Sequence, residues 1–306
     1  MKDNKILIIT GPTATGKTKL GIECANMFNG EIISSDSMQI YKHLNIGTAK
    51  PTKEEISQAK HHLIDVVEPD EEFSVQQFVK LAEDKINDLN KQNKLPIIVG
   101  GTGLYIKSLI YPYSFCSAPK DEKIREKYNK ILEKEGKEYL YSLLKEKDSK
   151  ACEKIHINDT KRVIRALEIC EITGKAKTDM NIEETKSKYN YVLIALNLPR
   201  NELYERINIR VDKMFEEGLL NEITSVLEAK KLTENNQSMQ AIGYKEFFEY
   251  FKNNLTLEET KSLIAKNSRN YAKRQITFIK GLKNVNWFNP LTDKDKILEF
   301  IKQELN

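Results

Sequence analysis

The sequence predicts an α/β protein, in which a parallel sheet is flanked by helices on both faces. Two observations predict this class: short apolar runs recur along the chain, and the segments between them have helical periodicity. Strands buried on both faces read as continuous apolar runs, and strands that alternate with helices imply parallel pairing. The expected strands are residues 6–9, 31–34, 96–99 and 191–198, with a weaker candidate at 284–288.

The strand-and-helix pattern breaks between residues 117 and 188, where the sequence is charged, rich in helical patterns and poor in apolar runs. We therefore expect a core domain whose first part is 1–116, a helical insertion domain at 117–188, and a second core part at 189–306 that ends in helices. Within the first part, Ser74 and Gln77 have the spacing of a capping box and predict a helix that starts there.

Composition limits the function classes. The chain has 306 residues and a formal net charge of +4, so a nucleic-acid partner must be argued from where the basic residues lie. The cysteines are scattered without C-x-x-C spacing, which is typical of a reduced protein. No apolar run approaches the roughly 20 residues of a membrane-spanning helix, and the chain enters its first strand almost at once. We expect no membrane partner and a cytoplasmic location.

The first expected strand leads into Gly11–Thr18, which we call the glycine-rich loop. It has the glycine-x4-glycine-lysine-threonine spacing of a phosphate-binding P-loop, placed between a strand and a helix. Glycines let the backbone aim its amide N–H groups at phosphate oxygens, while Lys17 adds a charge and Thr18 a hydroxyl suited to Mg²⁺. A chance match to a glycine-rich turn is the alternative, but the context favours a site for a phosphorylated molecule.

Asp36 follows the second expected strand, so it faces the same crevice as the glycine-rich loop. A carboxylate there can accept a proton from a nucleophile or hold a Mg²⁺-bound water; a turn or N-cap aspartate is the alternative. The later strands are not followed by the metal-holding aspartate of hydrolytic motors, which weakens an ATPase interpretation. The run 100–103 (GGTG) would allow a close approach to the backbone.

Basic residues form further candidate sites. Arg206, Arg210 and Lys213 fall on one stripe of a helix expected at 203–215, where an arginine could neutralise a diphosphate. The span 261–283 contains no acidic residue, and three of its lysines recur every seven residues: Lys266, Lys273 and Lys280. Such a helix suggests contact with an RNA backbone, and a solvated lysine-rich face is the alternative.

Two side chains of the same span, Tyr271 and Phe278, are assigned to the core rather than to base stacking. Earlier in the chain, Arg162 and Arg165 lie one turn apart and form a second candidate contact with RNA.

Several segments in order resemble the bacterial tRNA dimethylallyltransferase family (tRNA isopentenyltransferases). They are 11–18, 36–41, 45–51, 96–105, 162–168, 210–214, 241–246 and 271–275. The resemblance implies a P-loop NTPase-like parallel sheet flanked by helices, with a helical insertion domain. It also implies transfer of a dimethylallyl group from dimethylallyl diphosphate to the exocyclic N6 of the adenosine 3′-adjacent to the anticodon, which gives N6-isopentenyladenosine and diphosphate.

The resemblance assigns roles to residues at the phosphate end of the site. Asp36 is implied as the general base, Thr13 lies near the reacting carbon and the bridging oxygen, and Arg210 or secondly Arg206 pulls on the diphosphate. The glycine-rich loop is implied to hold dimethylallyl diphosphate, although it is often labelled a nucleotide (ATP) site. The diphosphate-binding residues are then Gly11, Pro12, Thr13, Ala14, Thr15, Gly16, Lys17, Thr18 and Arg206, with Thr18 on Mg²⁺.

The resemblance also assigns contacts with tRNA, whose target adenine must leave the anticodon-loop stack. The insertion would clasp the anticodon stem-loop, and the protein is expected to act as a monomer without an obligate protein partner. The implied tRNA contacts are Asp36, Ser37, Met38, Gln39, Thr102, Arg125, Lys161, Arg162, Val163, Ile164, Arg165, Gly243, Tyr244 and Lys245.

Three rival functions remain open at this point. An adenylate isopentenyltransferase would prenylate a free nucleotide, but such a substrate needs neither the insertion nor the basic helix. A P-loop kinase acting on a small hydroxyl substrate would consume ATP. An RNA-binding protein with a vestigial glycine-rich loop would not depend on Asp36 at all.

Overall fold

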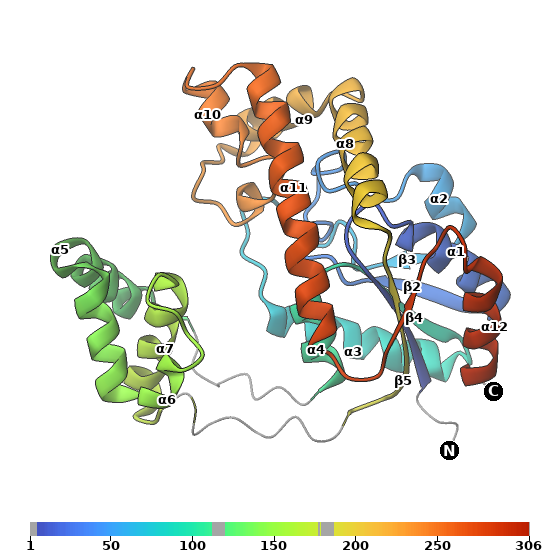
Figure 1. Cartoon of the computed structure of the whole chain (residues 1–306), viewed down its shortest axis with the longest axis horizontal. Helices are drawn as coiled ribbons and strands as arrows, with labels where there is room; N and C mark the ends of the chain where they lie inside the picture. The colour runs from blue at the N-terminus through green and yellow to red at the C-terminus, as the bar shows by residue number, and fades with distance from the viewer. Residues whose placement is uncertain (1–4, 112–119, 177, 179–186, 306) are drawn as a thin grey trace. The chain divides into compact units, whose positions relative to one another are not determined.

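The computed structural model describes residues 5–111, 120–176, 178 and 187–305. The chain divides into two compact units. Unit 1 comprises Met1–Ile110 and Lys188–Asn306, and unit 2 comprises Tyr111–Ser187, whereas the sequence places the insertion at 117–188. Unit 2 is drawn in green tones in Figure 1.

Unit 1 contains a six-stranded sheet of order β3-β2-β4-β1-β5-β6, in which every pair is parallel. The strands are β1 (Lys5–Thr10), β2 (Gly30–Ser34), β3 (His61–His62), β4 (Leu95–Val99), β5 (Asn190–Leu196) and β6 (Val285–Phe288). The predicted P-loop NTPase-like parallel sheet with flanking helices is confirmed. The sequence does not predict β3, because a two-residue strand is too short to show a period.

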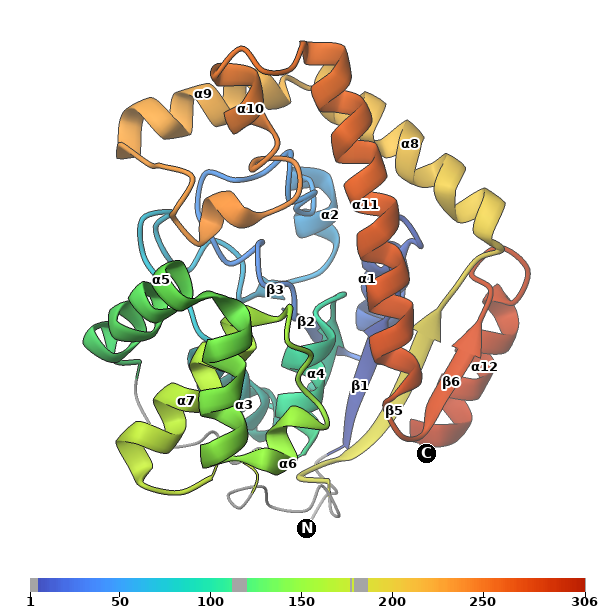
Figure 2. The same ribbon diagram turned by 60° about the vertical axis from the view of Figure 1, so that its left-hand side comes forward.

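Helices cover both faces of this sheet (Figures 1 and 2). Alternate residues of β1, Leu7 and Ile9, share an apolar cluster with α1 and α12, while α3, α4 and α11 lie over the opposite face. The double cover explains why the strands read as continuous apolar runs. The helices of unit 1 are α1 (Lys17–Met27), α2 (Lys53–Gln58), α3 (Val75–Lys91), α4 (Gly103–Ile110), α8 (Arg200–Glu216), α9 (Leu219–Lys230), the 3₁₀ turn η2 (Ser238–Gln240), α10 (Phe247–Phe251), α11 (Leu257–Lys280) and α12 (Lys294–Leu305).

The helix starts differ in a way that bears on function. Helices α2, α3 and α11 each begin with a complete capping box, and the predicted box of Ser74 and Gln77 on α3 is confirmed. Helix α1 instead begins after Gly16, which makes no side-chain cap. The first amide N–H groups of a helix have no partners within the helix. At α1 they are therefore available to an anion.

Unit 2 is built from α5 (Glu122–Lys147), α6 (Ser149–Cys152) and α7 (Thr160–Thr173). Non-helical backbone at Gly136 divides α5 into two segments. Side chains from all three helices form one apolar core, which includes Tyr128, Leu140, Ala151 and Leu167. In the part of the chain that the structure describes, no helix has both the length and the apolar character needed to cross a lipid bilayer.

Strands β2, β4 and β1 are neighbours, so the loops after them meet at the carboxyl edge of the sheet. Backbone hydrogen bonds join these loops: the N–H of Gly100 donates to the carbonyl of Ile9 at 3.2 Å, and the N–H of Ser35 donates to that of Val99 at 2.8 Å. Ligands of open α/β sheets bind at this edge. The edge therefore brings the glycine-rich loop, Asp36 and the 100–103 run together, as the sequence predicts.

Candidate active site

The glycine-rich loop connects β1 to α1 and turns tightly at its glycines. Gly11 has φ +143°, and a Cβ there would overlap the carbonyl oxygen of Leu196 at the end of β5. Gly16 has φ +83° and sets the start of α1. Inside the loop, the hydroxyl of Thr15 donates to the carbonyl of Pro12 at 2.8 Å. The loop therefore holds its shape before any ligand arrives.

Lys17 is the first residue of α1, and its ammonium group donates to the carbonyl of Pro12 at 2.8 Å. Burial and the neighbouring Arg210 lower the pKa of Lys17 to about 8, although the charge of Asp36 acts in the opposite direction. Two cations held close together in a poorly solvated place favour the binding of an anion, which would raise the pKa of Lys17 again.

Two arginines of α8 reach the glycine-rich loop from the side. The Nη1 atom of Arg210 donates to the hydroxyl oxygen of Thr13 at 2.9 Å, and the Nε atom of Arg206 donates to the carbonyl of Ala14 at 2.9 Å. Burial lowers the pKa of Arg210, and Asp36 partly offsets this effect. The third member of the predicted stripe, Lys213, is exposed. Two of the three cations of the stripe, Arg206 and Arg210, thus contact the glycine-rich loop.

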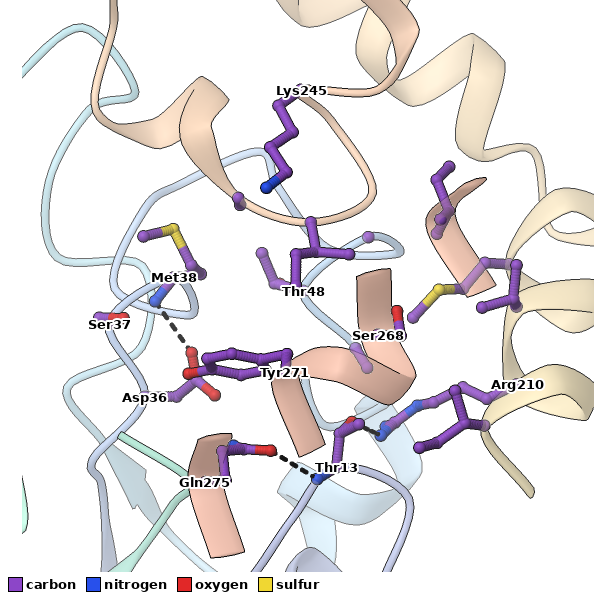
Figure 3. A pocket seen from close by; sticks show the side chains of 18 of the residues that line it. Thr13, Asp36, Ser37, Met38, Thr48, Arg210, Lys245, Ser268, Tyr271 and Gln275 are labelled. Carbon is purple, nitrogen blue, oxygen red and sulfur yellow. Dashed lines mark hydrogen bonds between the residues drawn. The ribbon is translucent and has the colours of Figure 1, made fainter. Parts of the chain in front are cut away.

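Asp36 lies two residues beyond the end of β2 and is half-buried. Its Oδ1 atom accepts the N–H of Met38 at 2.9 Å, which fixes the orientation of the carboxylate. Figure 3 shows the ring of Tyr271 beside this carboxylate. Burial and the charge of Asp36 raise the pKa of Tyr271 to about 12, with an opposing effect from a hydrogen bond to Thr102. The Tyr271 hydroxyl thus stays protonated at neutral pH.

These groups line one cavity of about 310 Å³. Of the residues that the sequence analysis singled out for catalysis or binding, the cavity contains Thr13, Lys17, Asp36, Ser37, Met38, Arg210 and Lys245. Other residues that line it are Gly47, Thr48, Ala49, Ile207, Val211, Met214, Gln240, Ala241, Ile242, Ile264, Ser268, Tyr271, Arg274 and Gln275. A proton acceptor, four cationic side chains and two residues of the glycine-rich loop, Thr13 and Lys17, therefore line one small space (Figure 3).

Other sequence-predicted residues of unit 1 lie around this cavity rather than in its lining. Gln39 ties β2 to the 45–49 loop, because its Oε1 accepts from Ser34 at 3.0 Å and its Nε2 donates to Ala49 at 3.1 Å. Thr102 accepts the N–H of Ser37 at 3.0 Å. Those outside the lining are Gly11, Pro12, Ala14, Thr15, Gly16, Thr18, Gln39, Thr102, Arg206, Gly243 and Tyr244.

The residues of the 243–245 segment lie in different surroundings: Lys245 lines the cavity, whereas Tyr244 is buried. Lys245 extends toward the cavity (Figure 3). Tyr244 is fully buried and its hydroxyl donates to Glu222 at 2.7 Å, which gives this side chain a structural position and leaves no surface for contact with RNA. Gly243 has φ +99°, a backbone conformation that favours glycine.

The predicted tRNA contacts of unit 2 lie on or near α7. Lys161 and Arg162 are exposed, whereas Val163 and Ile164 are buried in the core of the unit, where their side chains serve packing. Two arginines form ion pairs with the fully buried carboxylate of Glu168. The Nε atom of Arg125 lies 2.9 Å from Oε1, and the Nη1 atom of Arg165 lies 2.6 Å from Oε2.

Helix α11 contributes site residues that the sequence analysis missed. Ile264, Ser268, Tyr271 and Gln275 line the cavity from one face of the helix. The assignment of Tyr271 and Phe278 to the core is wrong: Tyr271 lines the cavity, and Phe278 is 38% exposed and packs near Gly103. The alternation of three and four residues between these positions marks one face of a helix, but it does not distinguish a cavity lining from a buried face.

The basic span on α11 is only partly available to a partner. Lys266, Lys273 and Lys280 are exposed. Lys261, in contrast, forms an ion pair with Asp212 of α8 at 2.8 Å, and Arg274 lies over the ring of Tyr271.

The donor set also fits Mg²⁺. This ion prefers oxygen ligands and is usually held by one or two protein groups together with substrate phosphates. The hydroxyl of Thr18, in the first turn of α1, and the carboxylate of Asp36 are oxygen ligands of this kind. Within the described ranges, no group of three or more His, Cys, Asp or Glu side chains is placed to hold a metal by itself.

Known proteins resemble the chain over nearly its whole length. The model of the family IPP transferase matches residues 39–282. A tRNA dimethylallyltransferase of Bacillus cytotoxicus is 46% identical over 97% of this chain and 94% of that protein. One from Acetivibrio thermocellus is 45% identical over 99% of this chain and 97% of that protein.

Two solved structures share the fold. The full-length tRNA isopentenylpyrophosphate transferase of Bacillus halodurans has a TM-score of 0.74 and 43% identity, and the match covers 99% of this chain and 97% of that one. A eukaryotic dimethylallyltransferase acting on tRNA has a TM-score of 0.82 and 32% identity over 98% of this chain and 80% of that one. On this evidence, the chain belongs to the IPP transferase family.

Proposed function

We propose that the protein is an enzyme that transfers a dimethylallyl group from dimethylallyl diphosphate to N6 of the adenosine next to the anticodon of tRNA. One observation supports this chemistry above all: Lys17, Arg210 and Asp36 line a single cavity. Cations stabilise a diphosphate leaving group, and a carboxylate accepts a proton from an amine nucleophile. The names of the relatives support tRNA as the acceptor and dimethylallyl as the transferred group.

The diphosphate would bind to the amide groups of the glycine-rich loop and of the first turn of α1. Lys17 then exchanges its hydrogen bond with Pro12 for one with a phosphate oxygen. Mg²⁺, held by Thr18 and the diphosphate, would supply further neutralisation of charge. Arg206 and Arg210 hold the loop from α8 and add positive charge at its edge.

Thr13 is the group proposed to assist departure of the diphosphate. Because Arg210 donates to the Thr13 oxygen, the hydroxyl hydrogen of Thr13 can be donated to the bridging oxygen of the substrate. As the bond between C1 and the bridging oxygen breaks, its electron pair moves to that oxygen. A guanidinium that polarises the hydroxyl strengthens this donation.

Asp36 is the proposed general base. The N6 atom forms a bond with C1 of the dimethylallyl group, and the surplus proton on N6 passes to the carboxylate. Its Oδ1 atom is oriented by the N–H of Met38, so we assign the proton to Oδ2. The Tyr271 ring lies beside this carboxylate and forms part of the same cavity wall.

The proposal includes tRNA contacts and a single chain as the working unit, acting on tRNA in the cytoplasm. The exposed cations Lys161 and Arg162 on α7 and Lys266, Lys273 and Lys280 on α11 are the groups best suited to phosphates of the anticodon stem-loop. Ser37, Met38 and Lys245 at the cavity are proposed to meet the extruded adenosine.

The test uses purified protein, Mg²⁺, labelled dimethylallyl diphosphate and tRNA from cells that lack the modification, with AMP and ATP in parallel. We expect label in tRNA, at the adenosine beside the anticodon. Label in the free nucleotide alone would support an adenylate isopentenyltransferase, and consumption of ATP without transfer would support a kinase. Transfer should be lost in Asp36→Asn and kept in Asp84→Asn, a matched change at an exposed aspartate of α3.

A further inference from the structure

We propose that Gln275 is a positioning residue that sets the location of the Thr13 hydroxyl for the transfer reaction. This inference rests on the proposed function and adds a residue to it. Gln275 lies on α11, and its side chain is only 5% exposed. Both ends of its amide are used: Oε1 accepts the N–H of Thr13 at 3.0 Å, and Nε2 donates to the carbonyl of Gly101 at 3.0 Å.

The two bonds join three segments that are distant in the sequence: the glycine-rich loop, the turn after β4 and helix α11. A side chain at position 275 must accept a hydrogen bond at one end and donate one at the other. Glutamine does both. A glutamate cannot donate to the Gly101 carbonyl, an asparagine is one methylene shorter, and a methionine has neither strong group.

Thr13 is consequently held at two points. Gln275 takes up its backbone N–H, so this amide is not among the groups offered to a phosphate, and Arg210 donates to its hydroxyl oxygen at 2.9 Å. The hydrogen bond from the Thr13 N–H fixes the position of the Thr13 side chain. The hydrogen bond to the Thr13 hydroxyl oxygen fixes the direction of the hydroxyl hydrogen. Because both ends of its amide are bonded to protein groups, Gln275 acts on the reaction through Thr13.

Gly101 shows how closely the bridge is packed. A Cβ atom at this position would overlap Nε2 of Gln275. Its neighbour Gly100 is packed in the same way against Ser35. The absence of a side chain at Gly100 and Gly101 therefore allows close packing of Ser35 and Gln275 against the backbone, rather than a close approach of substrate. A Gly101→Ala change should displace the Gln275 amide while leaving residue 275 itself intact.

The first experiment compares Gln275→Met with Gln303→Met, the same change at an exposed glutamine of α12. Single-turnover transfer to tRNA, the Kd for dimethylallyl diphosphate and the Kd for tRNA are measured for each. We expect the transfer rate of Gln275→Met to fall about 100-fold, the scale of a misplaced reactive group. Both Kd values should stay within about threefold of wild type and the control should be unchanged, since a positioning defect acts mainly after binding.

Two further variants test the route of the effect. Gly101→Ala should lower the rate in the same way, and Gln275→Met added to Thr13→Ala should cost little beyond Thr13→Ala alone, because coupled residues are not additive. Hydrogen exchange of the glycine-rich loop, followed by mass spectrometry, reports the loss of the Gln275 bond without any activity. If Gln275→Met does not fold, Gly101→Ala carries the same test.

A rate within threefold of wild type in variants whose loop exchange has increased would overturn the proposal. Additive losses with Thr13→Ala would overturn it as well, because Gln275 would then act by another route. Failure of the proposed function itself is visible separately, as an absence of transfer by the wild-type protein.

Discussion

Replacing Glu222 by glutamine should destabilise unit 1 strongly, although the two side chains have nearly the same shape. Glu222 lies on α9, and its carboxylate holds the 45–47 backbone, which leads into the cavity wall. Oε2 accepts from Asn45 at 2.8 Å and from Ile46 at 2.9 Å. Oε1 accepts from Ile46 at 3.0 Å, from Gly47 at 3.2 Å and from the Tyr244 hydroxyl at 2.7 Å.

The magnitude follows from these contacts. Every group around the carboxylate is a donor, so the amide nitrogen of a glutamine would face an N–H wherever it is placed. If the amide nitrogen of the glutamine takes the place of Oε2, the hydrogen bond from the Asn45 N–H is lost. The N–H groups of Ile46 and Gly47 and the Tyr244 hydroxyl then donate to a neutral amide oxygen instead of a charged carboxylate. Hydrogen bonds to charged groups contribute about 1.5–3 kcal/mol and neutral ones about 1 kcal/mol. The expected loss, reduced because Glu222 is half-buried, is about 3 kcal/mol.

The assay is urea unfolding followed by tryptophan fluorescence. The chain has one tryptophan, Trp287 on β6, so the signal reports on unit 1. With an m-value of about 3 kcal/mol/M, the midpoint should fall by about 1 M urea. Glu228→Gln, at an exposed position of the same helix, is the control. A midpoint within about 0.2 M of wild type, or an equal fall in the control, would refute the reasoning.

Three further predictions concern the site. Asp36→Asn should lower the transfer rate by about 10²–10⁴ with little change in tRNA affinity, measured by single-turnover labelling and filter binding. The affinity for dimethylallyl diphosphate, measured by calorimetry without tRNA, should fall as pH rises through about 8, where free Lys17 loses its proton. Because a bound diphosphate favours the charged form of Lys17, the Lys17→Met variant should bind dimethylallyl diphosphate more weakly, and its affinity should no longer depend on pH in this range. Changing three exposed lysines of α11 to glutamine should weaken tRNA binding and reduce its dependence on salt, while diphosphate binding is retained; they are Lys266, Lys273 and Lys280.

The charge of Lys17 also affects the stability of the fold. The pKa of Lys17 is lower in the folded protein than its ordinary value, so between about pH 8 and that value the unfolded chain binds more protons. By linkage, this residue destabilises the fold below about pH 8, and its penalty is relieved as the pH rises further. Urea midpoints of the wild-type protein and of Lys17→Met should therefore converge at high pH.

Much of the phosphate end of the site could be predicted because it is local. The glycine-rich loop is a contiguous segment with fixed spacing, and Asp36 follows an apolar strand by two residues. Parallel strands place their carboxyl ends at one edge, so these two segments could be brought together without knowing the tertiary structure. The stripe on α8 was also visible, since helical periodicity depends only on the spacing of residues.

The opposite wall of the cavity could not be found in this way. Tyr271 and Gln275 have spacings that fit a buried helix face as well as a cavity lining, and only the packing of α11 against α8 and the sheet separates the two. The clamp between Glu222 and the 45–47 backbone gives no sequence signal, because a carboxylate on a helix is ordinarily solvated. The same holds for Tyr244, whose burial depends on the position of Gly47 against its ring.

The sequence alone determined the α/β class, five strands with their approximate bounds, the glycine-rich loop and the helix that starts at the Ser74 capping box. Each depends on residues that are close in the chain, so composition and period contain the information. Only the tertiary structure decided that Gln275, 262 residues beyond Thr13, holds its amide. It also decided that Arg210 polarises the Thr13 hydroxyl and that Tyr271 stands beside Asp36. The physical reason is that such contacts depend on how whole elements pack, which local propensity does not encode.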